Sequence, residues 1–81
     1  MVYIYVLKLV NNHYYVGKTT DPTFRIETHF NSKGAVFTKK YKPLRIHELI
    51  SGQTDHDEQR VTQEYMMKYG IQKVRGGPWT Q

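Results

Sequence analysis

The sequence predicts a small α+β fold, in which a three-stranded antiparallel sheet is flanked by helices in the order β-β-α-β-α. Three observations predict this fold. Apolar and tyrosine residues form two neighbouring runs at the N-terminus, two later segments begin with helix-capping signals, and a short run between them has apolar residues at period two. With 81 residues, the chain has room for one domain, residues 1–81, with one modest core.

The first two strands are expected to form a hairpin over residues 2–17. Residues 2–10 are rich in Val, Tyr, Ile and Leu on both alternating faces, which is typical of a central strand covered on both sides. Asn11 and Asn12 indicate a turn, because asparagine tolerates positive φ better than most residues other than glycine. The run 13–17 then returns as the second strand.

The first helix is expected to begin at Asp21-Pro22 and to run to about residue 31. Aspartate is a favoured N-cap, and proline at the first helical position removes no hydrogen bond that the helix needs. Ile26 and Phe30 lie one turn apart and are expected on the buried face. Gly34 ends the pattern, and residues 35–42 form a short basic and aromatic connector.

The remaining pattern predicts one more strand and one more helix. Leu44, Ile46 and Ile50 recur at period two, which predicts a third strand over residues 44–50. Thr54 and Asp57 resemble a capping box, which predicts a helix over about 56–69. Residues 71–81 are expected to be mostly irregular. The second helix is expected to bury Val61, Tyr65 and either Met66 or Met67.

The composition excludes several classes of protein. The chain has no cysteine, so neither disulfides nor thiolate metal sites hold it together, which fits a reducing compartment. No apolar run approaches the roughly 20 residues of a membrane-spanning helix, and the N-terminus lacks the features of a secretory signal. We therefore expect an intracellular protein, in the cytoplasm or nucleus, that is neither secreted nor bound to a membrane. So short a chain also disfavours a large cavity for a small-molecule substrate.

Three side chains have chemistry that suits phosphoryl transfer. Arg25 and His29 share a face of the first helix, where a guanidinium can grip two phosphate oxygens and an imidazole can move a proton. Glu64 on the second helix could supply a hard oxygen ligand for Mg²⁺. Each also has an ordinary structural explanation, such as a surface pair of Glu64 with Lys68, so the case depends on the order and spacing of the whole set.

That order and spacing resemble a known nuclease family. The chain carries Tyr3-Ile4-Tyr5, then Tyr15-Val16-Gly17-Lys18-Thr19, then Arg25 and His29. The connector 34–43 follows, and Glu64 lies upstream of Tyr69-Gly70. In these features the chain resembles the GIY-YIG nucleases, specifically their small stand-alone members. The resemblance covers about residues 2–77 and implies a GIY-YIG-like fold.

The resemblance implies an endonuclease that hydrolyses a phosphodiester bond in DNA with one divalent ion, Mg²⁺ or Mn²⁺. Arg25 would bind phosphate and Glu64 would hold the metal. Tyr5 or His29 would take a proton from the attacking water. A tyrosine base would need a nearby cation, because the ordinary pKa of its hydroxyl is about 10. The catalytic residues expected on this basis are Tyr5, Tyr15, Lys18, Arg25, His29 and Glu64.

The hairpin gives an independent test of this site. A two-residue turn at Asn11-Asn12 would place Tyr5 and Tyr15 on opposite faces, because a slip of one residue reverses the face of a strand. A shared site needs an odd-length loop or a bulge. We predict a three-residue loop with one asparagine in the left-handed region.

The charge of the chain favours a polyanion as partner. Twelve Lys and Arg against seven Asp and Glu give a formal net charge of +5. Contacts to phosphates position a duplex and carry little sequence information, so sequence specificity would come from DNA shape, from loops, or from a protein partner or fused domain. The DNA-contacting residues expected around the connector are Lys33, Lys39, Lys40, Lys42 and Arg45.

Two other functions stay open at this point. Members of the family often carry an asparagine after the second helix, and no asparagine follows Asn31 here. The chain could therefore be a weak or inactive relative that binds nucleic acid without cutting it. It could also be a protein-interaction domain whose basic charge is incidental, in which case salt-dependent binding to DNA would be absent.

Overall fold

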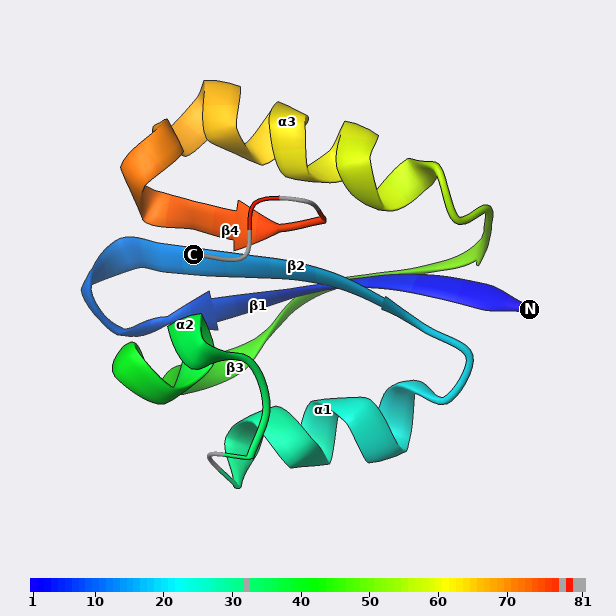
Figure 1. The fold of residues 1–81 in the computed structure, drawn as a ribbon, viewed down its shortest axis with the longest axis horizontal. Helices are drawn as coiled ribbons and strands as arrows, with labels where there is room; N and C mark the ends of the chain where they lie inside the picture. The colour runs from blue at the N-terminus through cyan, green and yellow to red at the C-terminus, as the bar shows by residue number, and fades with distance from the viewer. Residues whose placement is uncertain (32, 78, 80–81) are drawn as a thin grey trace.

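A computed structural model describes residues 1–31, 33–77 and 79 and contains a four-stranded mixed sheet (Figure 1). The strand order is β3 (Pro43–Gln53), β1 (Val2–Leu9), β2 (His13–Thr19) and β4 (Val74–Gly76). β1 pairs antiparallel with both neighbours, whereas β4 pairs parallel with β2. The α+β class is confirmed, but the expected three-stranded antiparallel sheet is wrong. The fourth strand has three residues, which is too short to show a period in the sequence.

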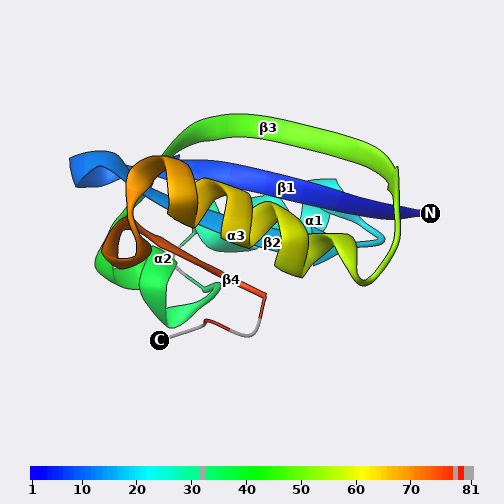
Figure 2. The same cartoon turned by 90° about the horizontal axis from the view of Figure 1, so that it is seen from above.

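Helices cover both faces of the sheet. α3 (Asp57–Tyr69) lies on one face, and α1 (Pro22–Phe30) with the short α2 (Val36–Lys40) lies on the other (Figures 1 and 2). Two single turns connect elements: η1 (Val10–Asn12) joins β1 to β2, and η2 (Ile71–Lys73) joins α3 to β4. No helix in the described ranges is long and apolar enough to cross a membrane.

The alternation of β1 divides the core into two clusters. Ile4 and Val6 point toward α3, whereas Tyr5, Leu7 and Leu9 point toward α1 and α2. All five side chains are buried, which confirms that β1 is a central strand covered on both faces. The α3 cluster also contains Tyr14, Val16, Val61, Met66 and Val74, and the other cluster contains Ile26 and Phe37.

The hairpin loop has the predicted length. Leu9 pairs with His13, so three residues, Val10–Asn12, connect the strands. Both Asn11 (φ 58°) and Asn12 (φ 60°) are left-handed, whereas one such asparagine was expected. The resulting register pairs Tyr5 with Gly17 and Leu7 with Tyr15, which puts Tyr5 and Tyr15 on the same face.

The first helix differs from its prediction in which residue it buries. Asp21 caps it as expected, accepting a hydrogen bond from the Phe24 amide at 3.2 Å. Phe30, expected in the core, is 41% exposed, whereas His29 is only 2% exposed. The basic connector also has structure of its own, because α2 forms within it. Phe37 of α2 is buried in the same cluster as Leu7 and Leu9. This packing stabilises a helix in a segment whose sequence pattern predicted only a connector.

Candidate active site

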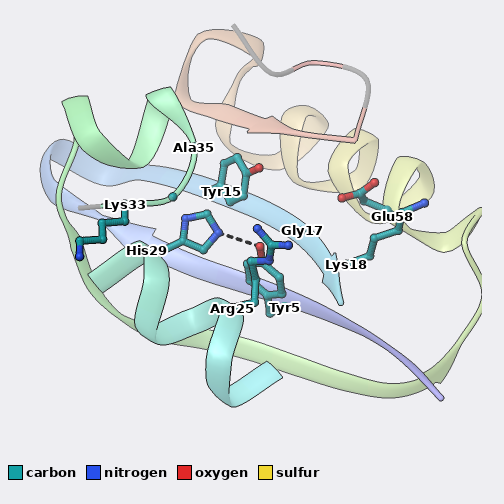
Figure 3. Close-up of a pocket in the computed structure, with 10 residues that line it drawn as sticks. Tyr5, Tyr15, Gly17, Lys18, Arg25, His29, Lys33, Ala35 and Glu58 are labelled. Carbon is teal, nitrogen blue, oxygen red and sulfur yellow. Dashed lines mark hydrogen bonds between the residues drawn. The ribbon is translucent and has the colours of Figure 1, made fainter. Parts of the chain in front are cut away.

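One polar pocket opens at the side of the sheet that faces α1 (Figure 3). Its volume is about 300 Å³, enough for a phosphate group and several waters but not for a large ligand. Its walls come from the hairpin, from α1, from the segment after α1 and from the first turn of α3. The lining residues are Tyr5, Tyr15, Gly17, Lys18, Arg25, His29, Lys33, Gly34, Ala35 and Glu58.

The two tyrosines enter the pocket from neighbouring strands. Their ring centroids lie 6.4 Å apart, and each ring also lies against His29. Gly17 makes room for Tyr5, because a Cβ at that position would lie 2.3 Å from the Tyr5 ring. The three-residue loop and this glycine together explain how the hairpin places both hydroxyl-bearing rings at one site.

Tyr5 and His29 form a buried hydrogen bond of 2.8 Å between Oη and Nε2 (Figure 3). Burial, followed by the positive charge of Arg25, lowers the pKa of His29 from 6.5 to about 4. His29 is therefore neutral at pH 7, so one ring nitrogen keeps a free lone pair. Burial also raises the pKa of Tyr5 above its ordinary value, despite the opposing charge of Arg25. The Tyr5 hydroxyl therefore holds its proton.

Arg25 supplies the fixed positive charge of the pocket. It comes from α1, one turn before His29, and its exposed side chain lines the cavity. Within the described part of the chain, no carboxylate lies within ion-pair distance of Arg25. Its guanidinium fork is therefore available to an anion that enters the pocket.

The carboxylate in the pocket lining is Glu58, whereas Glu64, the glutamate predicted to hold the metal near Arg25, is not among the lining residues. Glu58 lies in the first turn of α3 and lines the cavity (Figure 3). Glu64 is absent from the lining; its side chain is 59% exposed and pairs with Arg60 at 3.2 Å. The ordinary reading of Glu64 as a surface ion pair describes its environment, with Arg60 in place of Lys68 as the partner.

The ionisation of Glu58 is affected by burial, by charge and by two backbone amides. Burial raises the pKa of its carboxyl, while the charge of Lys18 and hydrogen bonds from the Gly77 and Lys18 backbone amides act in the opposite direction. The Lys18 amide is not paired with β4, because β4 pairs with β2 only at Tyr14–Val16. The edge of β2 beyond Val16 therefore stays open to the start of α3.

The helical phase of α3 contains the signal that identifies Glu58. Val61 and Thr62 follow it by three and four residues, and Tyr65 follows it by seven. Val61 and Thr62 are buried and Tyr65 is half-buried, so Glu58 lies on the face that packs against the sheet. Glu64 is not followed by buried residues at this spacing, and its side chain is exposed. Spacing from the buried residues, not distance from the tyrosine motifs, distinguishes the two glutamates.

Comparison with known proteins agrees with this architecture. The family model described as the GIY-YIG catalytic domain matches residues 1–73, which is most of the chain. The chain belongs to the GIY-YIG family. Membership implies nuclease-type chemistry on a nucleic-acid substrate.

Several bacterial UPF0213 proteins are similar to this GIY-YIG chain. One from Halalkalibacterium halodurans is 29% identical over 84 residues, covering 95% of this chain and 87% of the relative. One from Bacillus pumilus is 33% identical over 75 residues, covering 90% and 72%. The UPF0213 protein YazA of Bacillus subtilis is 36% identical over 67 residues, covering 82% and 65%. No solved structure gave a significant match.

The lysines expected to contact nucleic acid in this GIY-YIG domain are only partly brought together. Lys33 lines the pocket, and Lys39 and Lys40 are exposed on α2. Lys42 is exposed just beyond α2. Arg45 lies on the other face of the sheet. It is the strand partner of Lys8, and cross-strand partners point to the same face. The Lys8 ammonium lies over the ring of Tyr14, which belongs to the cluster under α3.

Lys18 occupies the end of the pocket near Glu58. Its ammonium lies 3.7 Å from Asp55, and both side chains are well exposed. So open an ion pair is weak, and the ammonium can exchange Asp55 for a phosphate oxygen. Lys18 therefore lies near the Glu58 carboxylate. The cation that lowers the pKa of Tyr5 is Arg25, not Lys18.

Proposed function

We propose that this chain is a metal-dependent DNA endonuclease that hydrolyses a phosphodiester bond in the pocket between α1 and α3. One observation carries the proposal. A phosphate-binding guanidinium, a tyrosine–histidine pair and a carboxylate, from the three elements β1, α1 and α3, line one cavity of about 300 Å³. Arg25 would bind the scissile phosphate, Tyr5 and His29 would move the proton, and Glu58 would hold the metal.

The pocket suits one hard divalent cation. Within the described residues, no three side chains of His, Cys, Asp or Glu gather as a metal cluster. Mg²⁺ does not need such a cluster, because it commonly binds through one or two carboxylates, substrate phosphates and waters. Mg²⁺ or Mn²⁺ held by Glu58 would neutralise charge on the phosphate and on the leaving 3′ oxygen.

Tyr5 acts as a proton relay in this proposal. Its raised pKa disfavours a standing phenolate, so neither Arg25 nor Lys18 is needed to stabilise one. As Tyr5 Oη accepts a proton from the attacking water, its own proton passes to Nε2 of His29 over the 2.8 Å hydrogen bond. The water oxygen bonds to phosphorus while the bond to the 3′ oxygen breaks. Tyr15, beside both rings, orients the water or a phosphate oxygen.

The direct test is incubation of the protein with supercoiled plasmid. The proposal predicts nicked or linear DNA with Mg²⁺ or Mn²⁺ and intact plasmid when a chelator is added. Cutting that persists in excess chelator would contradict the metal assignment. Intact plasmid with every divalent ion would contradict the proposal of an active nuclease.

A binding module without catalysis is the second candidate, and the absence of any asparagine after Asn31 favours it. The backbone amide of Gly77 nevertheless lowers the pKa of the Glu58 carboxyl, against the effect of burial. A backbone amide that follows β4 therefore favours the ionised Glu58 carboxylate without an asparagine side chain. Salt-sensitive DNA binding combined with no cleavage would select the binding module.

A further inference from the structure

Thr38 is a buried polar residue next to the candidate active site but outside its lining. It lies on α2 and its side chain is fully buried. Its Oγ1 lies 2.9 Å from Nδ1 of His29 and also 2.9 Å from the carbonyl oxygen of Ala35. A continuous row of hydrogen bonds therefore runs from Ala35 through Thr38 and His29 to Tyr5.

Counting hydrogens assigns a direction to this row. A threonine hydroxyl has one hydrogen, and a carbonyl oxygen has none. If the Thr38 hydrogen pointed at His29, then Oγ1 and the Ala35 oxygen would face each other at 2.9 Å with no hydrogen between them. When the Thr38 hydroxyl donates to Ala35 instead, Oγ1 can accept from Nδ1–H of His29. Only this second arrangement places a hydrogen in both contacts.

We propose that Thr38 is a positioning residue that fixes His29 as the Nδ1-protonated tautomer, so that Nε2 faces the Tyr5 hydroxyl as a bare acceptor. The opposite tautomer would carry its hydrogen on Nε2 and could not take the proton from Tyr5. The histidine is neutral in the pocket, so the choice of tautomer decides whether it can act as a base. The catalytic consequence rests on the proposed nuclease function, whereas the tautomer itself does not.

Gly34 keeps the ring where Thr38 can reach it. A Cβ at position 34 would lie 2.1 Å from Nδ1 of His29, so any larger residue would push the imidazole away from this position. The segment after α1 and the first turns of α2 thus form one side of the imidazole slot. The Tyr5 and Tyr15 rings contact the same imidazole at centroid distances of 5.5 and 5.0 Å.

The test is nitrogen NMR of the full chain labelled with ¹⁵N-histidine, at pH 7 and without DNA. The proposal predicts that His29 shows a protonated Nδ1 and an unprotonated Nε2. T38V keeps the shape of the side chain but removes the acceptor, so the proton should move partly or fully to Nε2. T38S keeps the hydroxyl and should retain the parental tautomer. A parental His29 protonated at Nε2, or a T38V spectrum identical to the parent, would overturn the proposal.

The kcat and KM for DNA cleavage give a second test, because a Thr38 that only supported the fold would not lower kcat selectively. T38V should lower kcat by about 10- to 100-fold, as loss of an orienting partner commonly does, with KM for DNA unchanged. T38S should recover most of that loss. Because the tautomer is read without DNA or metal, it remains decisive even if the protein fails to cut. A T38V variant with the parental kcat would overturn the positioning role.

Discussion

His29 is the residue of α1 that is buried within the pocket wall. Of the two nitrogens on its ring, one meets Tyr5 and the other meets Thr38, so both are used within the fold. Burial and the neighbouring Arg25 both disfavour the imidazolium, and the adjacent tyrosines offer no charge to compensate. The folded protein therefore prefers the neutral ring, whereas the unfolded chain has a histidine with an ordinary pKa.

This preference makes stability depend on pH in a defined window. The pKa of His29 is lower in the folded state, so as pH falls below 6.5 the unfolded chain binds a proton that the folded protein does not. Stability should be lost between about pH 6.5 and about pH 4, amounting to about 2 kcal/mol at pH 5. Denaturant unfolding of the parent and of H29Q near pH 7.5 and near pH 5 measures this difference. Equal pH dependence in both proteins would contradict the assignment.

At the scale of elements, the sequence predicted what local patterns encode. The N-terminal hairpin, the Asp21 cap and the extents of α1 and α3 all follow from short-range signals, and the structure confirms them. β4 and α2 were not predicted, because β4 is three residues long and α2 depends on the packing of Phe37. Phe30 was assigned to the core because it is apolar, but the polar tyrosine face draws His29 inward instead.

The limit of local sequence patterns also explains why Glu64, and not Glu58, was predicted as the glutamate of the pocket. Glu58 and Glu64 are both plausible ligands when read along the chain, and the motif order alone does not separate them. The burial of Val61 and Thr62 fixes the rotation of α3 about its axis, and that rotation points Glu58 at the pocket. Rotation of a helix is a tertiary property, which is why the fold was easier to predict than this site residue.

The hairpin loop offers a prediction about one element alone. Asn12 has φ 60°, a conformation that costs alanine more than asparagine or glycine. N12A should destabilise the protein by about 1 kcal/mol, whereas N12G should change stability by less than about 0.5 kcal/mol. Unfolding in urea measures both. If N12A proves as stable as the parent, the loop geometry is wrong.

Across the whole molecule, basic side chains lie on both faces of the sheet. Lys33, Lys39 and Lys40 lie on the pocket side, whereas Lys68 lies on α3, which covers the other face. A duplex that delivers a phosphate to Arg25 would lie along the pocket side. Phosphate contacts release counterions, so binding should weaken steeply as salt rises.

A matched pair of lysines tests this placement. Lys40 and Lys68 each lie over a tyrosine ring, at 5.4 and 5.3 Å, so replacing either removes one charge and one similar contact. K40Q should lower the slope of log affinity against log salt by about one, as expected for one lost phosphate contact, and K68Q should leave it unchanged. Titration of labelled duplex DNA at several salt concentrations measures both slopes. Equal salt slopes for K40Q and K68Q would contradict the prediction that DNA binds on the pocket side.

The convergence of the hairpin, α1 and α3 on one pocket is most directly tested by comparing the two glutamates of α3. E58Q and E64Q make the same chemical change six residues apart on one helix. E58Q should abolish Mg²⁺-dependent plasmid cleavage while retaining the fold and DNA binding, and E64Q should cut at the parental rate. Loss of cleavage in E64Q with normal cleavage in E58Q would contradict the account.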